Sequence, residues 1–358
     1  MVNVLVVEDS PVAAQLLCHI LGADPEVNVM AVACNAREAL AFLGKQRPDV
    51  ITMDINMPGM DGYETTRQIM KTYPTPIVIV SSVYNPGEVS ASFKVIEAGA
   101  LTILEKPPGT KHPDYHRKAQ ELVTTIKLMA EVKVVRRIPI GSSMPVTQKE
   151  TPIVDATAIA SDIHLVAIGA STGGPVVLQS ILSGLPEGFP IPIVIVQHIS
   201  RGFTDGFVRW LTQTSGYPVK IATHGEMVRP YQAYVAPDGL HMGIDLKGCI
   251  LLSGDCQAGI ICPSVSHLFR TVAASLGRYV MAILLTGMGK DGASELKLIR
   301  DRGGFTVAQD RESSTIYGMP AEAVRIGAAT SVLSPEGILQ LLVETAKKKK
   351  GGLGDASK

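Results

Sequence analysis

Five polar side chains in the first third of the chain have the types and spacing that phosphoryl transfer requires. Glu8 and Asp9, Asp54, Ser81 and Lys106 each end a short apolar run that is typical of a buried strand. If these runs form one parallel sheet, their carboxyl ends meet at one edge and gather the five side chains. Carboxylate oxygens at such an edge suit Mg²⁺, and a carboxylate beside the ion can accept a phosphoryl group. The alternative, that strand-end carboxylates only cap the following helices, explains one residue better than five.

A second candidate site begins at Ser171, in a glycine-rich turn. The run HLVAIGA leads into G-A-S-T-G-G-P and then into a helical pattern, so the serine lies at a strand–helix corner. The pattern fits G-x-S-x-G, in which small neighbours expose a nucleophilic hydroxyl beside helix N-terminal amides that stabilise an oxyanion. A phosphate-binding loop would need G-x-G-x-x-G or a GK[ST] ending, and neither occurs here. A plain structural turn explains the glycines but leaves the serine unexplained.

A serine nucleophile needs a base and a group that orients the base. His198 directly follows the apolar run IPIVIVQ, and Asp291 lies in LLTGMGKDGA after another apolar run. A lone histidine is more often an ordinary core or surface residue, but its position after a neighbouring strand favours the role of base. Three strands would then deliver Ser171, His198 and Asp291 to one sheet edge as a triad. Their order along the chain differs from the Ser…Asp…His order of α/β-hydrolases, which disfavours a standard member of that class.

The elements that must position these residues follow an alternating pattern in both halves of the chain. In the first 130 residues, five β-branched runs alternate with amphipathic helical patterns, which predicts a doubly wound, five-stranded parallel domain. From residue 164 a second alternation predicts another doubly wound, mostly parallel α/β domain, with one antiparallel excursion around residues 231–253. The expected strands are 164–169, 191–197, 218–223, 232–236, 249–252, 280–286, 305–308 and 330–333, and the expected helices are 174–183, 203–214, 264–276, 290–302 and 319–326.

Between and after these patterns the periodicity is lost. We expect a first domain over residues 1–128, a linker over 129–162 and a second domain over 163–346. The end of the chain, KKKKGGLGDASK, predicts a flexible basic tail over 347–358.

The composition excludes several classes of protein. Lys and Arg total 33 and so do Asp and Glu, which disfavours a bulk electrostatic partner such as nucleic acid or an anionic membrane. The five cysteines form no C-x-x-C pair and are an odd number, so we expect each to be a small hydrophobic residue in a reducing compartment. No apolar run approaches the roughly 18 residues that span a bilayer, and the chain opens on a strand pattern without a leader. We therefore expect a cytoplasmic protein with no membrane insertion.

The first half resembles the receiver domains of two-component response regulators. The resemblance rests on VLVVEDSP, MDINMPGMDGYE, IVIVSS and LEKP, spread over residues 1–125. It implies that Asp54 is the phospho-acceptor, that Glu8 and Asp9 bind Mg²⁺ together with Asp54, and that Ser81 and Lys106 are the switch residues. It also implies a histidine kinase as phosphodonor.

The second half resembles the chemotaxis protein-glutamate methylesterases. The matching segments include GASTGGP, VIVQH, YVAPDGLHM, PSVSHLF, ILLTGMGKDGA and GGFTVAQD. The resemblance implies that Ser171 is the nucleophile, His198 the general base and then acid, and Asp291 the group that orients His198. It further implies that Thr172 and Met288 shape the oxyanion and substrate site.

Together the two resemblances imply a phosphorylation-activated enzyme. It would hydrolyse glutamyl methyl esters, and deamidate glutamines, on the cytoplasmic domains of methylated chemoreceptors. Mg²⁺ would serve phosphorylation, and ester hydrolysis would need no cofactor. Three alternatives remain: a receiver that controls a DNA-binding output, although no helix after residue 160 carries a Lys/Arg stripe; a receiver-regulated, non-catalytic adaptor; and a general serine esterase.

Overall fold

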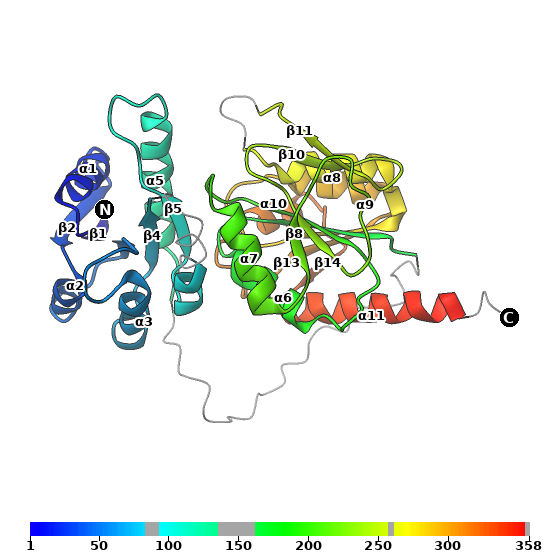
Figure 1. The fold of residues 1–358 in the computed structure, drawn as a ribbon, viewed down its shortest axis with the longest axis horizontal. Helices are drawn as coiled ribbons and strands as arrows, with labels where there is room; N and C mark the ends of the chain where they lie inside the picture. Colours follow the sequence, from blue (N-terminus) through cyan, green and yellow to red (C-terminus); the bar gives the residue numbers. More distant parts are fainter. Residues whose placement is uncertain (83–92, 135–161, 257–260, 355–358) are drawn as a thin grey trace, which may run out of the picture. The chain divides into compact units, whose positions relative to one another are not determined.

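The computed structural model describes residues 1–82, 93–134, 162–256 and 261–354 (Figure 1). The chain divides into two compact units, Met1–Met144 and Pro145–Lys358. Most of the predicted linker, residues 135–161, lies outside the described part.

The first unit is a parallel sheet of five strands in the order β2-β1-β3-β4-β5. This confirms the predicted doubly wound class. Its elements are β1 (Val2–Val7), α1 (Pro11–Gly22), β2 (Val27–Ala33), α2 (Ala36–Leu43), β3 (Val50–Met53), α3 (Gly62–Thr72), β4 (Ile77–Ser81), β5 (Thr102–Glu105) and α5 (Tyr115–Ala130). Residues 93–98 are also helical.

Local sequence explains where the first helices begin. Ser10, Asn35 and Asp61 each precede a helix, and each side chain accepts a hydrogen bond from a backbone N–H of the first turn. Strands β3 and β4 are buried along their whole length, as expected for central strands of a sheet that is covered on both faces. Capped helices and buried strands together place the carboxyl ends of β1, β3, β4 and β5 at one edge.

The second unit is built on a seven-stranded sheet in the order β14-β13-β12-β6-β7-β9-β8, with all pairings parallel. The strands are β6 (Leu165–Ala170), β7 (Ile193–Gln197), β8 (Val219–Ile221), β9 (Ala233–Val235), β12 (Val280–Leu284), β13 (Phe305–Gln309) and β14 (Ser331–Leu333). A separate antiparallel hairpin, β10 (His241–Ile244) with β11 (Ile250–Ser253), confirms the predicted excursion. The strand β10 itself was not predicted.

Helices cover both faces of this sheet (Figure 1). They are α6 (Gly174–Gly184), α7 (Thr204–Ser215), α8 (Val265–Ser275), α9 (Ala293–Asp301), α10 (Met319–Arg325) and α11 (Pro335–Gly354). Apolar residues of α8, α9 and α10 share one buried core with alternate residues of β6, β7 and β12. On the other face α6 contacts both α7 and α11. The sheet is thus a rigid support whose middle strand, β6, ends at the glycine-rich turn.

The predicted tail is wrong in its first residues. Helix α11 continues through Lys347–Lys350 to Gly354, and Lys349 Nζ donates a hydrogen bond to the carbonyl of Ile163. Lysine is a good helix former, and cations near a helix C-terminus interact favourably with the helix dipole. The charge run therefore prolongs the helix.

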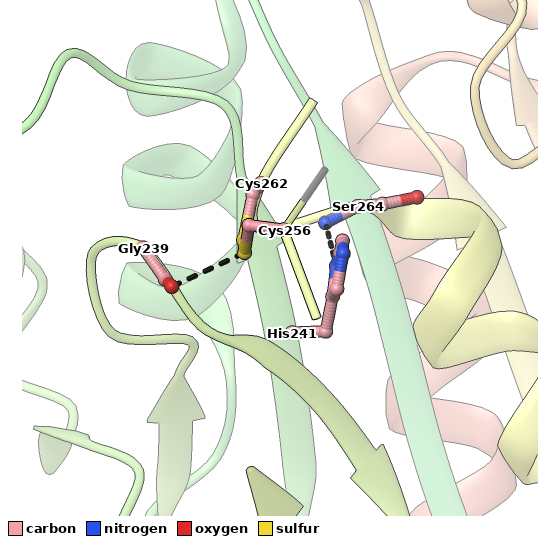
Figure 2. The surroundings of a disulfide bond; sticks show 5 residues. All are labelled: Gly239, His241, Cys256, Cys262 and Ser264. Carbon is pink, nitrogen blue, oxygen red and sulfur yellow. Dashed lines mark hydrogen bonds between the residues drawn. A yellow bond between two sulfur atoms is a disulfide. The ribbon is translucent and has the colours of Figure 1, made fainter. Parts of the chain in front are cut away.

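The cysteine prediction is also wrong for two residues. Cys256 and Cys262 form a disulfide, with Cα atoms 5.8 Å apart (Figure 2). The C-x₅-C spacing of these two cysteines matches no familiar motif, so the sequence alone did not indicate the bond. The other three cysteines, Cys18, Cys34 and Cys249, are free thiols; Cys18 and Cys249 are partly buried, whereas Cys34 is exposed and does not behave as a small hydrophobic residue of the core.

Candidate active site

The turn between β6 and α6 holds Ser171 at the carboxyl end of the middle strand. The Ser171 N–H donates to the carbonyl of Thr286, 3.0 Å away, and the Ser171 carbonyl accepts from Gly174 N–H at 2.8 Å. Gly173 has φ +81°, and a Cβ at this position would lie 2.4 Å from Thr315 Oγ1. Only glycine can therefore make this turn.

His198 follows β7, the strand beside β6. Its N–H donates to the carbonyl of Ala170 at 2.8 Å, so the imidazole-bearing residue stands next to the start of the serine turn. The buried Gln197 side chain donates from Nε2 to the carbonyls of both Ser171 and His198, each at 2.8 Å. One amide group thus ties together the main chains of the two residues.

Asp291 comes from the loop after β12, on the opposite side of β6. Its Oδ2 lies 2.9 Å from His198 Nε2. The carboxylate also accepts hydrogen bonds from the start of α8: Val265 N–H at 2.7 Å, Ser266 N–H at 3.0 Å and Ser264 Oγ at 2.9 Å. The helix N-terminus therefore fixes the carboxylate and favours its negative charge.

The protonation states follow from these contacts. Burial alone would raise the pKa of Asp291, but the hydrogen bond and charge of His198 and the hydrogen bonds of Ser266 outweigh it, and the pKa lies far below its ordinary value. A carboxylate can only accept hydrogen bonds, so His198 Nε2 carries a proton. In the neutral ring Nδ1 is then the nitrogen that can act as a base.

The structure joins the predicted histidine to the predicted aspartate but not to the serine hydroxyl. Among the residues that the structure describes, no hydrogen bond links Ser171 Oγ to His198. The two residues still stand at the ends of adjacent paired strands. Catalytic hydrogen bonds are often long before substrate binds, so the distance between the two side chains does not by itself exclude proton transfer.

Thr172 and Met288, the two other predicted residues, flank Ser171. The Thr172 carbonyl accepts a hydrogen bond from Thr286 Oγ1 at 3.0 Å. A Cβ on Gly287 would lie 2.6 Å from Ser171 Cβ, and the next residue, Met288, leaves 42% of its surface exposed. Both residues therefore lie next to residues that pack against Ser171, and their role in shaping a substrate site stays a prediction.

Three polar residues that hold this site were not identified from the sequence: Gln197, Ser264 and Ser266. Gln197 ends an otherwise apolar strand and is only 3% exposed, and a polar residue at such a position is a usable signal. Ser264 caps α8 through a hydrogen bond from His267 N–H, and a helix start was predicted there. Ser264 and Ser266 share the acceptor Asp291, which is distant in sequence, so the sequence did not indicate that contact.

The first unit gathers all five predicted residues at one sheet edge. Lys106 Nζ lies 2.8 Å from Glu8 Oε2 and 3.0 Å from Asp54 Oδ2. Oxygens of Glu8, Asp9 and Asp54 lie within 4.8 Å of one another. Ser81 is buried, and its carbonyl accepts a hydrogen bond from Lys106 N–H at 2.9 Å.

The electrostatics of this pocket favour a cation. Burial, aided by the charge of Asp54, raises the pKa of Glu8 against the lowering effect of Lys106. Burial would lower the pKa of Lys106, but Glu8 and Asp54 raise it above its ordinary value. Buried carboxylates that repel one another, with hard oxygens in a tight group, are a donor set that fits Mg²⁺.

Among the helices that the structure describes, none has both the length and the apolar character that crossing a bilayer requires.

Comparison with known proteins gives consistent matches for both units. Residues 166–342 match the CheB methylesterase family, and residues 4–112 match the response regulator receiver domain. The protein-glutamate methylesterase/protein-glutamine glutaminase 1 of Syntrophus aciditrophicus is 50% identical over 347 residues, which cover 97% of this chain and 99% of that protein. The corresponding Nitrosospira multiformis protein is 48% identical and covers 98% of both chains.

A solved structure is similar to the second unit. The crystal structure of the Thermotoga maritima CheB methylesterase catalytic domain is 36% identical in sequence, with a TM-score of 0.49, and the match covers 51% of this chain and 98% of that one. Since relatives 48–50% identical extend over nearly the whole length, the chain belongs to the protein-glutamate methylesterase/protein-glutamine glutaminase family and carries a response regulator receiver domain.

Proposed function

We propose that the chain is a cytoplasmic, phosphorylation-activated protein-glutamate methylesterase that also deamidates glutamines. Its substrates are the cytoplasmic domains of methyl-accepting chemoreceptors. The observation that carries the chemical half is the 2.9 Å contact of His198 with Asp291, formed at the end of the strand beside Ser171. In a catalytic triad, a buried, ionised carboxylate orients the imidazole, and the imidazole then takes the proton of the serine hydroxyl.

The reaction begins at Ser171. His198 takes the hydroxyl proton on Nδ1 while Oγ attacks the γ-carbonyl carbon of the glutamyl ester. Collapse of the tetrahedral intermediate breaks the bond to the methoxy group, which leaves as methanol with the proton from His198. Water, deprotonated by His198, then hydrolyses the acyl-enzyme to free glutamate. With a glutamine substrate ammonia leaves in place of methanol.

Asp291 stabilises the imidazolium that forms in each step, and it remains ionised throughout. Thr172 and Met288 shape the space that receives the developing oxyanion, next to the N-terminus of α6. No other group is assigned a proton-transfer role.

Regulation resides in the first unit. A histidine kinase supplies the phosphoryl group, and Asp54 accepts it. Glu8, Asp9 and Asp54 would hold Mg²⁺, which neutralises charge on the phosphoryl group when bound. Ser81 and Lys106 bind the new phosphoryl oxygens. Phosphorylation of Asp54 shifts the population of molecules from a less active to a more active form.

The test of the chemistry is methanol release from membranes that contain methylated receptors. We expect Ser171→Ala to lower the rate by at least about a thousandfold, as loss of a nucleophile does elsewhere. The matched control is Ser183→Ala, which removes an exposed hydroxyl on α6 that donates only to Ser180. Equal, measurable rates for wild type and Ser171→Ala would show that Ser171 is not the nucleophile, and no release by either protein would point to a non-catalytic adaptor. Rapid hydrolysis of p-nitrophenyl acetate with no release from receptors would point to a general serine esterase.

A further inference from the structure

The disulfide lies directly before the helix that holds the triad's aspartate. Cys262 is separated from Ser264, the N-cap of α8, by one residue. The Ser264 hydroxyl donates to Asp291 Oδ1 at 2.9 Å, and the next residue, Val265, donates its N–H to Oδ2 at 2.7 Å. Any constraint on Cys262 therefore acts within three residues of the groups that hold the carboxylate.

A second contact links the same segment to the hairpin. Ser264 N–H donates to Nδ1 of the buried His241, 3.2 Å away, on β10 (Figure 2). The His241 ring in turn stacks on His267 of α8, with ring centroids 4.8 Å apart. The start of α8 is thus held from two sides, by the disulfide and by His241.

The disulfide is partly exposed, and a neighbouring carbonyl could accept a proton from the Cys256 thiol after reduction. Cys256 Sγ lies 3.2 Å from the carbonyl oxygen of Gly239, a contact in which a thiol would donate its proton (Figure 2). Both cysteines are partly exposed, and the neighbouring Ile261 leaves 52% of its surface open. Accessible disulfides exchange with small thiols more readily than buried ones do.

We infer that Cys256 and Cys262 form a reversible redox-modification site that tunes the triad through the N-terminus of α8. The effect on activity rests on the proposed function, whereas the thiol–disulfide exchange at these two cysteines does not. One protein thiolate attacks a low-molecular-weight disulfide of the glutathione type and releases one small thiolate. The second protein thiolate attacks the mixed disulfide and releases the other. The protein sulfurs are oxidised, the small disulfide is reduced, and two protons are given up.

The direction of the effect follows from the structure. In the disulfide form the seven residues from Cys256 to Cys262 form a closed ring, which restricts the segment that leads into α8. Reduction removes this restriction, so Ser264 and Val265 hold Asp291 less firmly and His198 is oriented less well. The oxidised form is therefore the more active one.

A metal site is the competing explanation for the same residues. One ligand atom each of His241, Cys256 and Cys262 lie within 4.8 Å of one another. However, the two sulfurs are bonded to each other, and Nδ1 of His241 accepts the Ser264 N–H, which assigns the ring proton to Nε2. Metal binding would need both arrangements to be broken, so the contacts favour thiol–disulfide exchange.

The experiment equilibrates the full-length protein in oxidised and reduced glutathione mixtures and makes three measurements on each sample. Free thiols are counted, the bridged peptide is identified by mass, and amide hydrogen exchange is followed at Val265 and Ser266. The rate of ester hydrolysis is measured in parallel. We expect two fewer thiols in the oxidised sample, faster amide exchange at both residues after reduction, and about a fivefold lower turnover that reoxidation restores.

The variants separate this pair from other cysteines. Cys256→Ser and Cys262→Ser should each remain at the reduced level of turnover and should not respond to glutathione. Cys249→Ser, which removes a partly buried free thiol of the same unit, should respond as wild type does.

Three results would overturn the inference. The first is an unchanged thiol count across the glutathione mixtures. The second is a disulfide that forms without changing amide hydrogen exchange at Val265 and Ser266. The third is stoichiometric zinc in the purified protein that blocks disulfide formation until a chelator removes it. If disulfide formation and amide hydrogen exchange change together but no ester is hydrolysed, the redox site is supported and the proposed hydrolytic function is wrong.

Discussion

At the scale of single residues, one amide side chain, that of Gln197, connects the main chains of Ser171 and His198 by hydrogen bonds. Gln197 is buried, and its Nε2 donates to the carbonyls of both Ser171 and His198. Without this donor the Ser171 carbonyl still accepts from Gly174 N–H, but the His198 carbonyl loses the Gln197 hydrogen bond, and an unsatisfied buried group costs about 1–3 kcal/mol. We therefore expect the orientation of the Ser171 and His198 side chains to depend on this donor.

We therefore expect Gln197→Ala to lower kcat about tenfold, equivalent to ~1.4 kcal/mol, with little change in KM. The measurement is methanol release over a range of receptor concentrations. Gln179→Ala is the matched control. Gln179 lies on α6, and its Nε2 also donates to a backbone carbonyl, that of Thr214, which is not part of the site. A change in KM alone would show that Gln197 contacts substrate and does not position the catalytic groups.

Asp291 supports a prediction about stability and pH. Its pKa is depressed in the folded protein, so the stabilisation that it supplies is present above the ordinary carboxyl pKa of about 3.9 and is lost as the pH falls below it. Asp291→Asn should lower the free energy of unfolding by about 2 kcal/mol at pH 7 and at pH 5 alike, and this difference should shrink at pH 3.5.

Urea unfolding at the three pH values can be followed by the fluorescence of Trp210. It is the only tryptophan in the chain and lies buried in α7, so it reports on the second unit. If the difference in free energy of unfolding between wild type and Asp291→Asn already disappears between pH 7 and pH 5, Asp291 is not an ionised carboxylate with a strongly depressed pKa.

The positions of Ser171, His198 and Asp291 were predictable because each follows a strong apolar strand or a glycine-rich turn. The groups that hold them were not. Ser264 was expected only as part of a helix start, and its role depends on Asp291, which reaches it through the fold and not along the chain. The Cys256–Cys262 bond was also missed, because C-x₅-C is not a spacing that indicates a disulfide.

At the scale of elements, prediction succeeded where periodicity is long. The expected helix 264–276 is α8, Val265–Ser275, and the expected strand 305–308 is β13, Phe305–Gln309. β10 was missed because its four residues, HMGI, include a polar histidine and a glycine, which weaken the strand signal although all four are buried. The extent of α11 was missed because a lysine run next to glycines resembles a tail, although a helix can extend into it.

The turn from β6 to α6 supports a prediction at this scale. Gly173→Ala introduces two costs: a positive φ of +81° and a Cβ that would lie 2.4 Å from Thr315 Oγ1. Gly248→Ala is a matched control, since Gly248 has the same φ but nothing within 4 Å of the added Cβ. We expect the control to lose about 1–2 kcal/mol of stability and to keep its activity, and Gly173→Ala to lose more and to hydrolyse ester at least tenfold more slowly.

Urea unfolding and turnover of the two variants should be compared side by side. Similar stabilities and similar turnover for Gly173→Ala and Gly248→Ala would mean that the serine turn tolerates a side chain, and the tight geometry assigned to it would be wrong.

At the scale of the whole molecule, the class of each half followed from alternation alone, because buried parallel strands and amphipathic helices have distinct periods. The relation between the halves did not follow, because the residues between them have no lasting period. The proposed regulation belongs to this scale: if a phosphoryl group on Asp54 changes the rate of ester hydrolysis, only a response of the full-length chain can report it.

We expect a small phosphodonor with Mg²⁺ to raise the turnover of full-length protein at least about fivefold, in line with typical coupling between sites. Asp54→Ala should not respond, because the acceptor oxygen is gone, and removal of Mg²⁺ with a chelator should abolish the response of wild type. Asp49→Ala is the control: Asp49 accepts a hydrogen bond from Asn3 N–H in an exposed position of the same unit. Its variant should respond as wild type does. If Asp54→Ala responds as strongly as wild type, the signal does not pass through the acidic pocket, and the regulatory half of the proposed function is wrong even if Ser171 is the nucleophile.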